Sequence, residues 1–184
     1  MKNNNWSLGK TAVVAALIGL AALGTMIIRI PIPASEGYFN IGDVFVILAG
    51  LWLGPRAGLI VGALGPTIAD AVGYPQFILA TFIIKGTEGL LVGLIGGGQK
   101  EYSLGRRTFA ATVGGFIIVA GYFVFEAWVY PLLGNYIPFF KVTDIGGAIA
   151  ELPANIAQAI IGIVGGLALW KPLGRTLDKK SKTS

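Results

Sequence analysis

Two charged side chains lie in the middle of a long apolar stretch of the sequence. The stretch runs from Gln76 to Gly98, and Lys85 and Glu88 stand three positions apart within it. About 20 apolar residues, rising about 1.5 Å each as a helix, span the hydrocarbon of a bilayer. A charge at that depth costs at least about 2.5 kcal/mol, so both side chains must face a protein interior or a polar cavity. They either form an internal ion pair that holds helices together or belong to a site that receives a polar solute.

Two later apolar stretches carry polar groups at helical spacing. Glu126 and Tyr130 are four residues apart. Glu151, Asn155 and Gln158 follow the i, i+4, i+7 pattern of one helical face. Carboxylates, amides and hydroxyls together can accept and donate the hydrogen bonds that hold a small polar molecule.

The composition is that of an integral membrane protein. Hydrophobic residues make up 54% of the 184 residues and charged residues 12%, and the mean hydropathy is +0.74. The absence of Cys and His excludes disulfides, thiol chemistry, His-ligated metals and His bases, and we predict no metal site and no cofactor. The net charge of +5 comes from predicted loops and the C-terminal tail, so we expect no nucleic-acid partner.

The apolar stretches predict one all-α membrane domain over residues 1–184 with six transmembrane helices. The helices are expected at residues 11–28, 40–54, 56–72, 76–98, 108–133 and 144–170. Residues 29–42 are expected to form a loop over the bundle, and Asp43 is placed to cap the second helix. Glycine pairs at four-residue spacing, Gly50/Gly54 and Gly58/Gly62, predict close packing around the turn between the second and third helices.

The distribution of Lys and Arg predicts the orientation. With six crossings both termini lie on one side, and only Arg29 and Lys141 fall on the other. The basic residues on the first side are Lys2, Lys10, Arg56, Lys100, Arg106, Arg107, Lys171, Arg175, Lys179, Lys180 and Lys182. Because cytoplasmic loops carry the excess of positive charge, both termini are predicted to be cytoplasmic.

With this orientation, the position of a residue along its helix gives its depth below the outer surface of the membrane. Lys85 lies about 13 Å from the outer end of its helix, and Glu126 and Glu151 lie about 10 Å from theirs. The polar groups therefore share the outer half of the membrane, and the inner half is apolar. Such a cluster, covered by aromatic loops, is typical of a pocket for a small solute and not of a channel. Lys85 is favoured at the pocket floor, and Glu88, one turn deeper, as a structural brace.

The predicted substrate-binding residues lie in this outer half or in the loops that cover it. They are Asn40, Gln76, Lys85, Glu126, Tyr130, Glu151 and Asn155. No catalytic residue is predicted, since the chain has neither a GxxxxGK[ST] phosphate loop nor an HExxH motif. We expect a non-enzymatic membrane subunit that takes its energy from a partner.

An alanine-rich first helix is followed, in order, by the runs FNIGDVFVILAGLWLGPRAG, KGTEGLLVGLIGG and ELPANIAQ. In this order and spacing, over nearly its whole length, the chain resembles the substrate-binding S components of bacterial energy-coupling factor (ECF) vitamin transporters. The resemblance implies a multi-pass subunit of the cell membrane that captures a water-soluble vitamin outside. It implies delivery inward with a transmembrane coupling subunit, on which Ala12 and Ala16 would dock, and two ATPase subunits.

Within that family the chain looks most like the branch assigned to pyridoxine-type vitamins or hydroxymethylpyrimidine. A riboflavin-type member is the alternative, since it shares a Gly-Asp start to the second helix and a Lys-Gly…Glu-Gly run. Two readings from other classes stay open. One is a structural or assembly subunit whose buried charges only hold helices together, and the other is a membrane enzyme with Glu126 or Glu151 as base.

Overall fold

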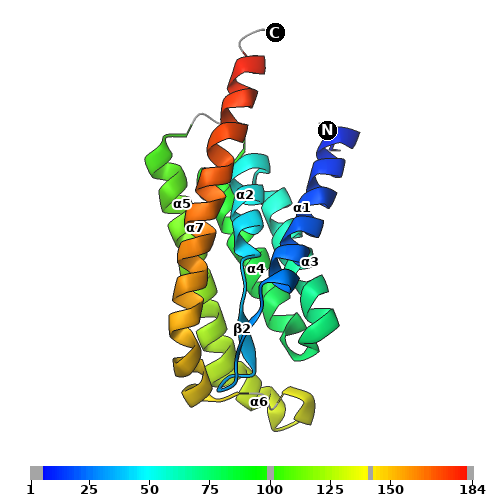
Figure 1. Cartoon of the computed structure of the whole chain (residues 1–184), viewed down its shortest axis with the longest axis vertical. Helices are drawn as coiled ribbons and strands as arrows, with labels where there is room; N and C mark the ends of the chain where they lie inside the picture. The colour runs from blue at the N-terminus through cyan, green and yellow to red at the C-terminus, as the bar shows by residue number, and fades with distance from the viewer. Residues whose placement is uncertain (1–5, 99–101, 141–142, 182–184) are drawn as a thin grey trace.

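The computed structural model describes residues 6–98, 102–140 and 143–181, and shows a bundle of long helices (Figure 1). The elements are α1 Leu8–Ile27, β1 Ile30–Ile32, β2 Gly37–Phe39, α2 Asp43–Leu53, α3 Pro55–Gly73, a 3-10 turn Pro75–Phe77, α4 Ile78–Gly96, α5 Leu104–Val124, a π-helical segment Phe125–Val129, α6 Tyr130–Gly134, a 3-10 turn Pro138–Phe140 and α7 Ile145–Ser181. α1 begins and α7 ends at the same end of the bundle, and α6 and the strands lie toward the other end (Figure 1).

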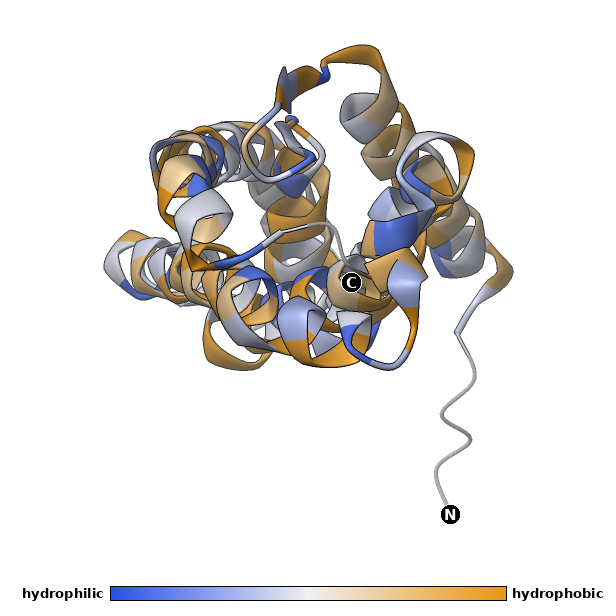
Figure 2. Ribbon diagram, turned by 90° about the horizontal axis from the view of Figure 1, so that it is seen from below, coloured by the Kyte–Doolittle hydropathy of each residue, from blue (hydrophilic) through white to orange (hydrophobic). Residues whose placement is uncertain are grey.

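The bundle has the surface of a membrane protein. Four described helical stretches are long and apolar enough to cross a bilayer: Leu8–Ile27, Pro75–Gly96, Leu104–Gly134 and Ile145–Leu173. Hydrophobic residues cover most of the ribbon (Figure 2). Large apolar side chains such as Phe116 and Val164 are 68% and 62% exposed, which suits contact with lipid. The membrane character and the helical architecture are as predicted, and the number of crossings remains a prediction.

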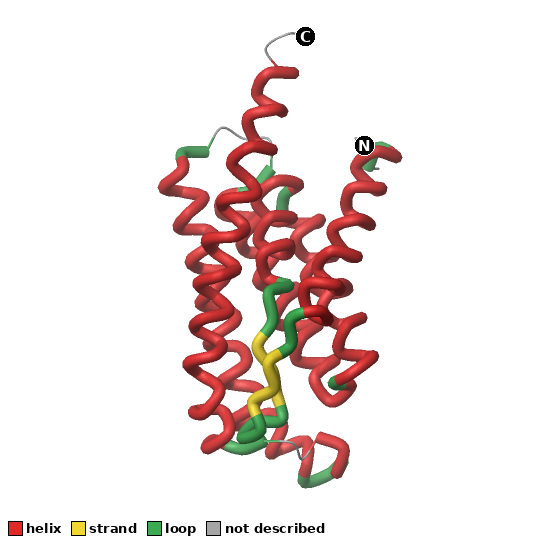
Figure 3. The backbone as a smooth tube through the Cα atoms, viewed as in Figure 1, coloured by secondary structure: helices red, strands yellow, loops and turns green. Residues whose placement is uncertain are grey.

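Residues 29–42, expected to be a loop, contain a β-hairpin. β1 and β2 pair antiparallel, with Ile30 opposite Phe39, and the turn between them includes Glu36 at a φ of 55°. The hairpin lies along the lower half of the bundle beside α7 (Figure 3). Three residues connect the hairpin to α2, and the 11 residues of α2 form a helix only about 16 Å long. Hairpin and short helix together therefore occupy the place of one long helix.

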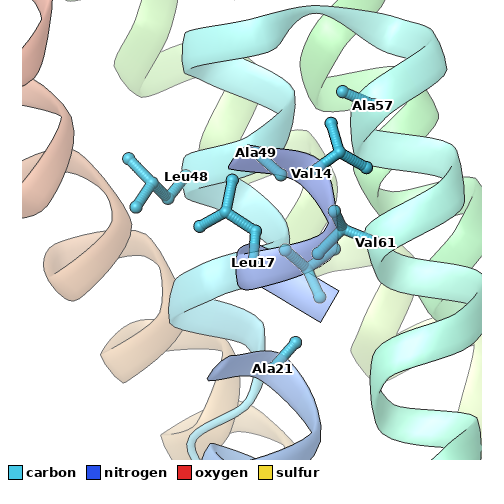
Figure 4. Packing of buried hydrophobic residues seen from close by; sticks show 8 residues of the cluster. Val14, Leu17, Ala21, Leu48, Ala49, Ala57 and Val61 are labelled. Carbon is cyan, nitrogen blue, oxygen red and sulfur yellow. The ribbon is translucent and has the colours of Figure 1, made fainter. Parts of the chain in front are cut away.

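Buried apolar residues of α1 pack against α2 and α3. Val14, Leu17 and Ala21 of α1 are buried, and they point toward the side chains of the neighbouring helices (Figure 4). Ala49 of α2 and Val61 of α3 complete this cluster and are fully buried. The opposite face of α1 is open: Ala12 and Ala16 are both exposed.

The glycine spacing noted in the sequence brings α4 against α2 and α3. A Cβ placed on Gly58 would lie 2.1 Å from the carbonyl oxygen of Gly89, and a Cβ on Gly89 would lie 2.1 Å from that of Gly58. A Cβ on Gly50 would lie 2.8 Å from the Gly89 carbonyl oxygen. The three backbones thus meet without side chains between them, as in small-residue packing of membrane helices.

Replacing Gly89 with Ala is expected to lower stability substantially. The added methyl group would meet backbone atoms of Gly58, which cannot rotate away, and overpacking of this kind costs typically about 1–3 kcal/mol and occasionally more. Thermal unfolding of the detergent-solubilised protein measures the effect. Gly19→Ala is the matched control, because a Cβ there meets no atom within 4 Å. An unfolding temperature for Gly89→Ala equal to that of Gly19→Ala would contradict the packing.

Candidate substrate-binding site

Buried polar side chains converge beneath the hairpin, at the end of the bundle away from the termini. The pocket there is lined by Gly37, Tyr38, Asn40, Phe77, Thr81, Tyr122, Glu151, Asn155 and Gln158. The lining comes from the hairpin and its flank, from the start of α4, from α5 and from α7. Aromatic rings, amides, hydroxyls and a carboxyl group around one cavity are the usual construction of a small-molecule site.

Asn40 is the centre of the hydrogen-bond network. Its backbone N–H and its side-chain Nδ2 both donate to Gln158 Oε1, each at 2.9 Å. Its Oδ1 accepts from Gly42 N at 3.0 Å and from Thr25 and Lys85, each at 3.5 Å. Asn40 thereby ties the segment after the hairpin to α1, α4 and α7, which fixes one wall of the pocket.

Lys85 pairs with Asp43 and not with Glu88. Lys85 Nζ lies 2.5 Å from Asp43 Oδ1, and the two side chains are 1% and 0% exposed. The predicted capping role of Asp43 is wrong: the residue before α2 is Gly42, and the Asp43 side chain turns to Lys85. Glu88 is fully buried, and neither of its carboxyl oxygens has a hydrogen-bond partner within the described ranges. Lys85 reaches the pocket through Asn40 and does not line it.

Glu151 joins α7 to the hairpin. Its Oε2 accepts a hydrogen bond from the Ser35 hydroxyl, which in turn accepts one from the Gly37 N–H at 3.1 Å. A Cβ on Gly37 would lie 2.4 Å from Glu151 Oε2, so only glycine leaves room for the carboxyl group in this position. Asn155 lies one turn further along α7, on the same side of the pocket.

Glu126 and Tyr130 lie behind this wall. Both are fully buried, Glu126 in the π-helical segment and Tyr130 at the start of α6. The Glu126 carboxyl group interacts with that of Glu151, although the two form no hydrogen bond of ordinary geometry. The Tyr130 ring stacks on Phe140 with centroids 6.1 Å apart and meets Phe77 edge-on at 5.5 Å. π-helical turns of this kind are frequently found at functional sites.

The hairpin is held on its other side by an aromatic and ionic cluster. The Tyr38 hydroxyl donates to Asp70, and its ring lies 4.3 Å from that of Tyr74. The Arg29 guanidinium lies 5.1 Å from the Tyr38 ring centroid and 5.3 Å from that of Tyr74. Burial, followed by the charge of Asp70, raises the pKa of the Tyr38 hydroxyl, so Tyr38 remains a neutral donor.

The predicted binding residues are therefore partly brought together. Asn40, Glu151 and Asn155 line the pocket, whereas Lys85 contacts it through Asn40 and Glu126 and Tyr130 lie behind it. Gln76 is half-buried in the turn before α4 and is not among the lining residues. The prediction missed Tyr38, Thr81, Tyr122 and Gln158. The spacing of Gln158 from Glu151 and of Tyr122 from Glu126 placed both on polar faces, which is the signal that could have found them.

The pocket has almost no free volume as the structure stands. Its free volume is about 10 Å³, room for roughly one water molecule. A larger cavity of about 710 Å³ opens near the termini, lined by residues such as Lys10, Trp52, Gly97 and Tyr102. Lys10 already donates to the Leu53 carbonyl oxygen at 3.2 Å there. The buried polar groups gather around the smaller pocket, which identifies it as the better candidate for a specific solute.

The sequence matches a known family of membrane proteins over almost its whole length. Residues 5–175 match the family model described as "ECF-type riboflavin transporter, S component". The match covers more than half of the chain. This chain belongs to the family of ECF-type S components. The expectation drawn from the resemblance is confirmed: the chain is a multi-pass membrane protein and an S component of an ECF-type transporter.

Three known proteins are similar to this chain over most of its length. An "uncharacterized protein in gap 3′region" of Pyrococcus woesei is 40% identical over 158 residues, which cover 84% of this chain and 97% of that protein. The thiamine precursor transporter HmpT of Lactococcus lactis is 27% identical over 94% of this chain and 92% of its own. A UPF0397 protein of Leuconostoc citreum is 30% identical over 88% of this chain and 87% of its own.

A solved structure shares the fold. The structure titled "Structure and mechanism of the S component of a bacterial ECF transporter" has a TM-score of 0.65 and 17% sequence identity, and the match covers 92% of this chain and 97% of that one. At this identity the likeness concerns the fold of the S component alone.

Proposed function

We propose that this S component captures a small nitrogen-containing aromatic vitamin or vitamin precursor, hydroxymethylpyrimidine or a pyridoxine-type compound, in the pocket beneath the hairpin. The observation that carries the proposal is the convergence of Asn40, Glu151, Asn155 and Gln158 on one pocket at the end of the bundle opposite the termini. Amides and a carboxyl group suit ring nitrogens and hydroxyl groups, and Phe77 and Tyr122 offer apolar ring surfaces beside them.

Two likenesses bear on the choice of ligand. The similarity to a thiamine precursor transporter over 94% of this chain favours the pyrimidine. Riboflavin is the second candidate, because the matching family model is described as a riboflavin transporter. Either ligand is far larger than the free volume of about 10 Å³, so the hairpin must move for the pocket to fill. Such a movement would have to break the Ser35–Glu151 and Tyr38–Asp70 hydrogen bonds that hold the hairpin.

The proposed topology has six membrane crossings with both termini in the cytoplasm. It is supported by the common end at which α1 begins and α7 ends (Figure 1) and by the excess of Lys and Arg there. The pocket then opens toward the outside. In this proposal the chain itself catalyses no reaction. A transmembrane coupling subunit docks on Ala12 and Ala16, and two ATPase subunits supply the energy for import.

A ligand screen tests the proposed function. The purified protein would be unfolded thermally with hydroxymethylpyrimidine, pyridoxine, pyridoxamine, riboflavin, thiamine and pantothenate in turn. One of the first four is expected to raise the unfolding temperature at micromolar concentration, since a ligand that binds only the folded state stabilises it. No stabilisation by any of the six would count against a vitamin-binding site, and stabilisation only by riboflavin would favour the second candidate.

Asn155→Ala is expected to weaken binding of the ligand that this screen identifies. Losing one buried hydrogen bond to a ligand costs typically about 1–3 kcal/mol, which corresponds to roughly 5- to 150-fold in the dissociation constant. Glu151→Ala should have an effect of at least this size, because it also releases the Ser35 contact of the hairpin. Isothermal calorimetry measures both. Wild-type affinity in both variants would show that the ligand does not bind in this pocket.

A further inference from the structure

We propose that the Glu126–Glu151 carboxyl pair makes this site select ligands that carry an amino group over ligands of the same shape that carry a hydroxyl group in its place. The inference rests on the proposed function, since it names the class of vitamin that the pocket takes. It states which chemical group of the ligand faces Glu151 on α7 and Glu126 in the π-helical segment after α5.

The two carboxyl groups come from separate helical segments and meet beside the pocket. Glu126 belongs to the π-helical segment Phe125–Val129, and Glu151 lies in the first turns of α7. Glu151 lines the pocket and is 3% exposed, and Glu126 is fully buried next to it. Two carboxyl groups side by side in a dry environment do not both ionise, so the pair shares one proton and keeps one negative charge that a positive or proton-donating group would stabilise.

The protein itself supplies little of what these carboxyl groups need. Apart from their contact with each other, Glu151 accepts one hydrogen bond from Ser35, and no other hydrogen-bond donor reaches either oxygen of Glu126 among the residues that the structure describes. Over the same ranges no salt bridge joins either carboxyl group to a lysine or arginine, because Lys85 is taken by Asp43. Buried acceptors left in this state are costly and bind strongly when a donor arrives.

An amino group on the ligand can donate more hydrogen bonds to this carboxyl pair than a hydroxyl group can. An ionised carboxylate only accepts hydrogen bonds, whereas an amino group offers at least two N–H donors and a hydroxyl group only one O–H. A protonated amine adds a charge-assisted bond, roughly twice as strong as a neutral one.

The test compares two pairs of ligands that differ only at this group. Pyridoxamine is measured against pyridoxine, and the aminopyrimidine form of hydroxymethylpyrimidine against the analogue with a hydroxyl group in place of the amino group. Calorimetry on the full-length, detergent-solubilised protein is expected to show tighter binding of the amino member of at least one pair by roughly 10- to 100-fold. Glu126→Gln keeps the shape of the side chain and is expected to reduce this ratio to within about threefold.

Glu151→Gln serves as the second variant and Glu36→Gln as the control. Glu36 is an exposed carboxylate in the turn of the same hairpin, and its removal is expected to leave the amino preference unchanged. Thermal unfolding without ligand, recorded for each variant, shows whether the fold is kept. Should Glu126→Gln unfold, the preference is read from Glu151→Gln.

The outcomes separate this inference from the proposed function. Equal affinity for amino and hydroxyl members, or an amino preference that survives both glutamine substitutions, overturns the selection by the carboxyl pair. Tight binding of riboflavin alone overturns it too, while the protein remains a vitamin-binding S component. Binding of none of these compounds contradicts the proposed function itself and the inference with it.

Discussion

An Ala12→Trp or Ala16→Trp variant is expected to bind its vitamin with wild-type affinity and to import almost none of it. Both alanines are exposed on α1, on the side away from the cluster with α2 and α3. Small residues at four-residue spacing let a second membrane helix approach closely, and an indole ring there would hold the partner away. The pocket lies under the hairpin and takes no lining residue from α1. Docking therefore fails while binding persists.

Uptake of labelled vitamin by cells that contain the coupling subunit and ATPases measures this loss, and calorimetry on the purified variants measures binding. Val164→Trp is the matched control, because Val164 is an apolar residue 62% exposed on α7, a helix that does not take part in the proposed docking. It is expected to import normally. Normal uptake by both alanine variants would refute docking through this face, and loss of binding would place the alanines in the pocket wall.

Lys85→Met is expected to produce the largest loss of stability of any single substitution considered. It leaves the Asp43 carboxylate fully buried without its ion-pair partner, and removing one member of a buried pair costs about 3–5 kcal/mol. The Asn40 Oδ1 contact at 3.5 Å is lost as well. Denaturation of the solubilised protein would measure the change. Lys171→Met, which removes an exposed lysine, is the control and is expected to alter stability by less than about 0.5 kcal/mol.

The double variant Lys85→Met with Asp43→Leu separates the structural role from the binding role. Replacing both members of a buried pair by apolar side chains is often neutral or stabilising, so most of the lost stability should return. If Lys85 acts only as a brace, ligand affinity returns with it. If Lys85 shapes the pocket through Asn40, affinity stays low in a stable protein. A double variant as unstable as Lys85→Met alone would contradict the assignment of Asp43 as the partner.

The sequence indicated the membrane fold and the region of the pocket because both depend on local patterns. Long apolar stretches set the helices, and the spacing of Glu151, Asn155 and Gln158 set one polar face. The family followed from the order of three runs and is confirmed by the family model. The helices and the polar face need only residues that are neighbours along one helix, and the family assignment needs only the order of runs along the chain.

Contacts between distant residues were not accessible in this way. Lys85 and Glu88 share a helical face, which favoured pairing them, but Asp43 lies 42 positions earlier in the chain and lies closer in space. The hairpin was missed because strands of three residues are too short for an alternating pattern, and Pro31 and Pro33 favour a loop. The π-helical segment leaves no mark in the apolar periodicity, so the meeting of Glu126 with Glu151 required the structure.

The closed pocket beneath the hairpin has a kinetic consequence. With a free volume of about 10 Å³, the described conformation has no room for a vitamin, so binding requires a more open conformation. The measured dissociation constant is then the intrinsic one divided by the fraction of molecules that are open. If a ligand binds beneath the hairpin as proposed, its escape would require the Ser35–Glu151 and Tyr38–Asp70 contacts to break. Its residence time is then expected to follow the rate at which the hairpin opens.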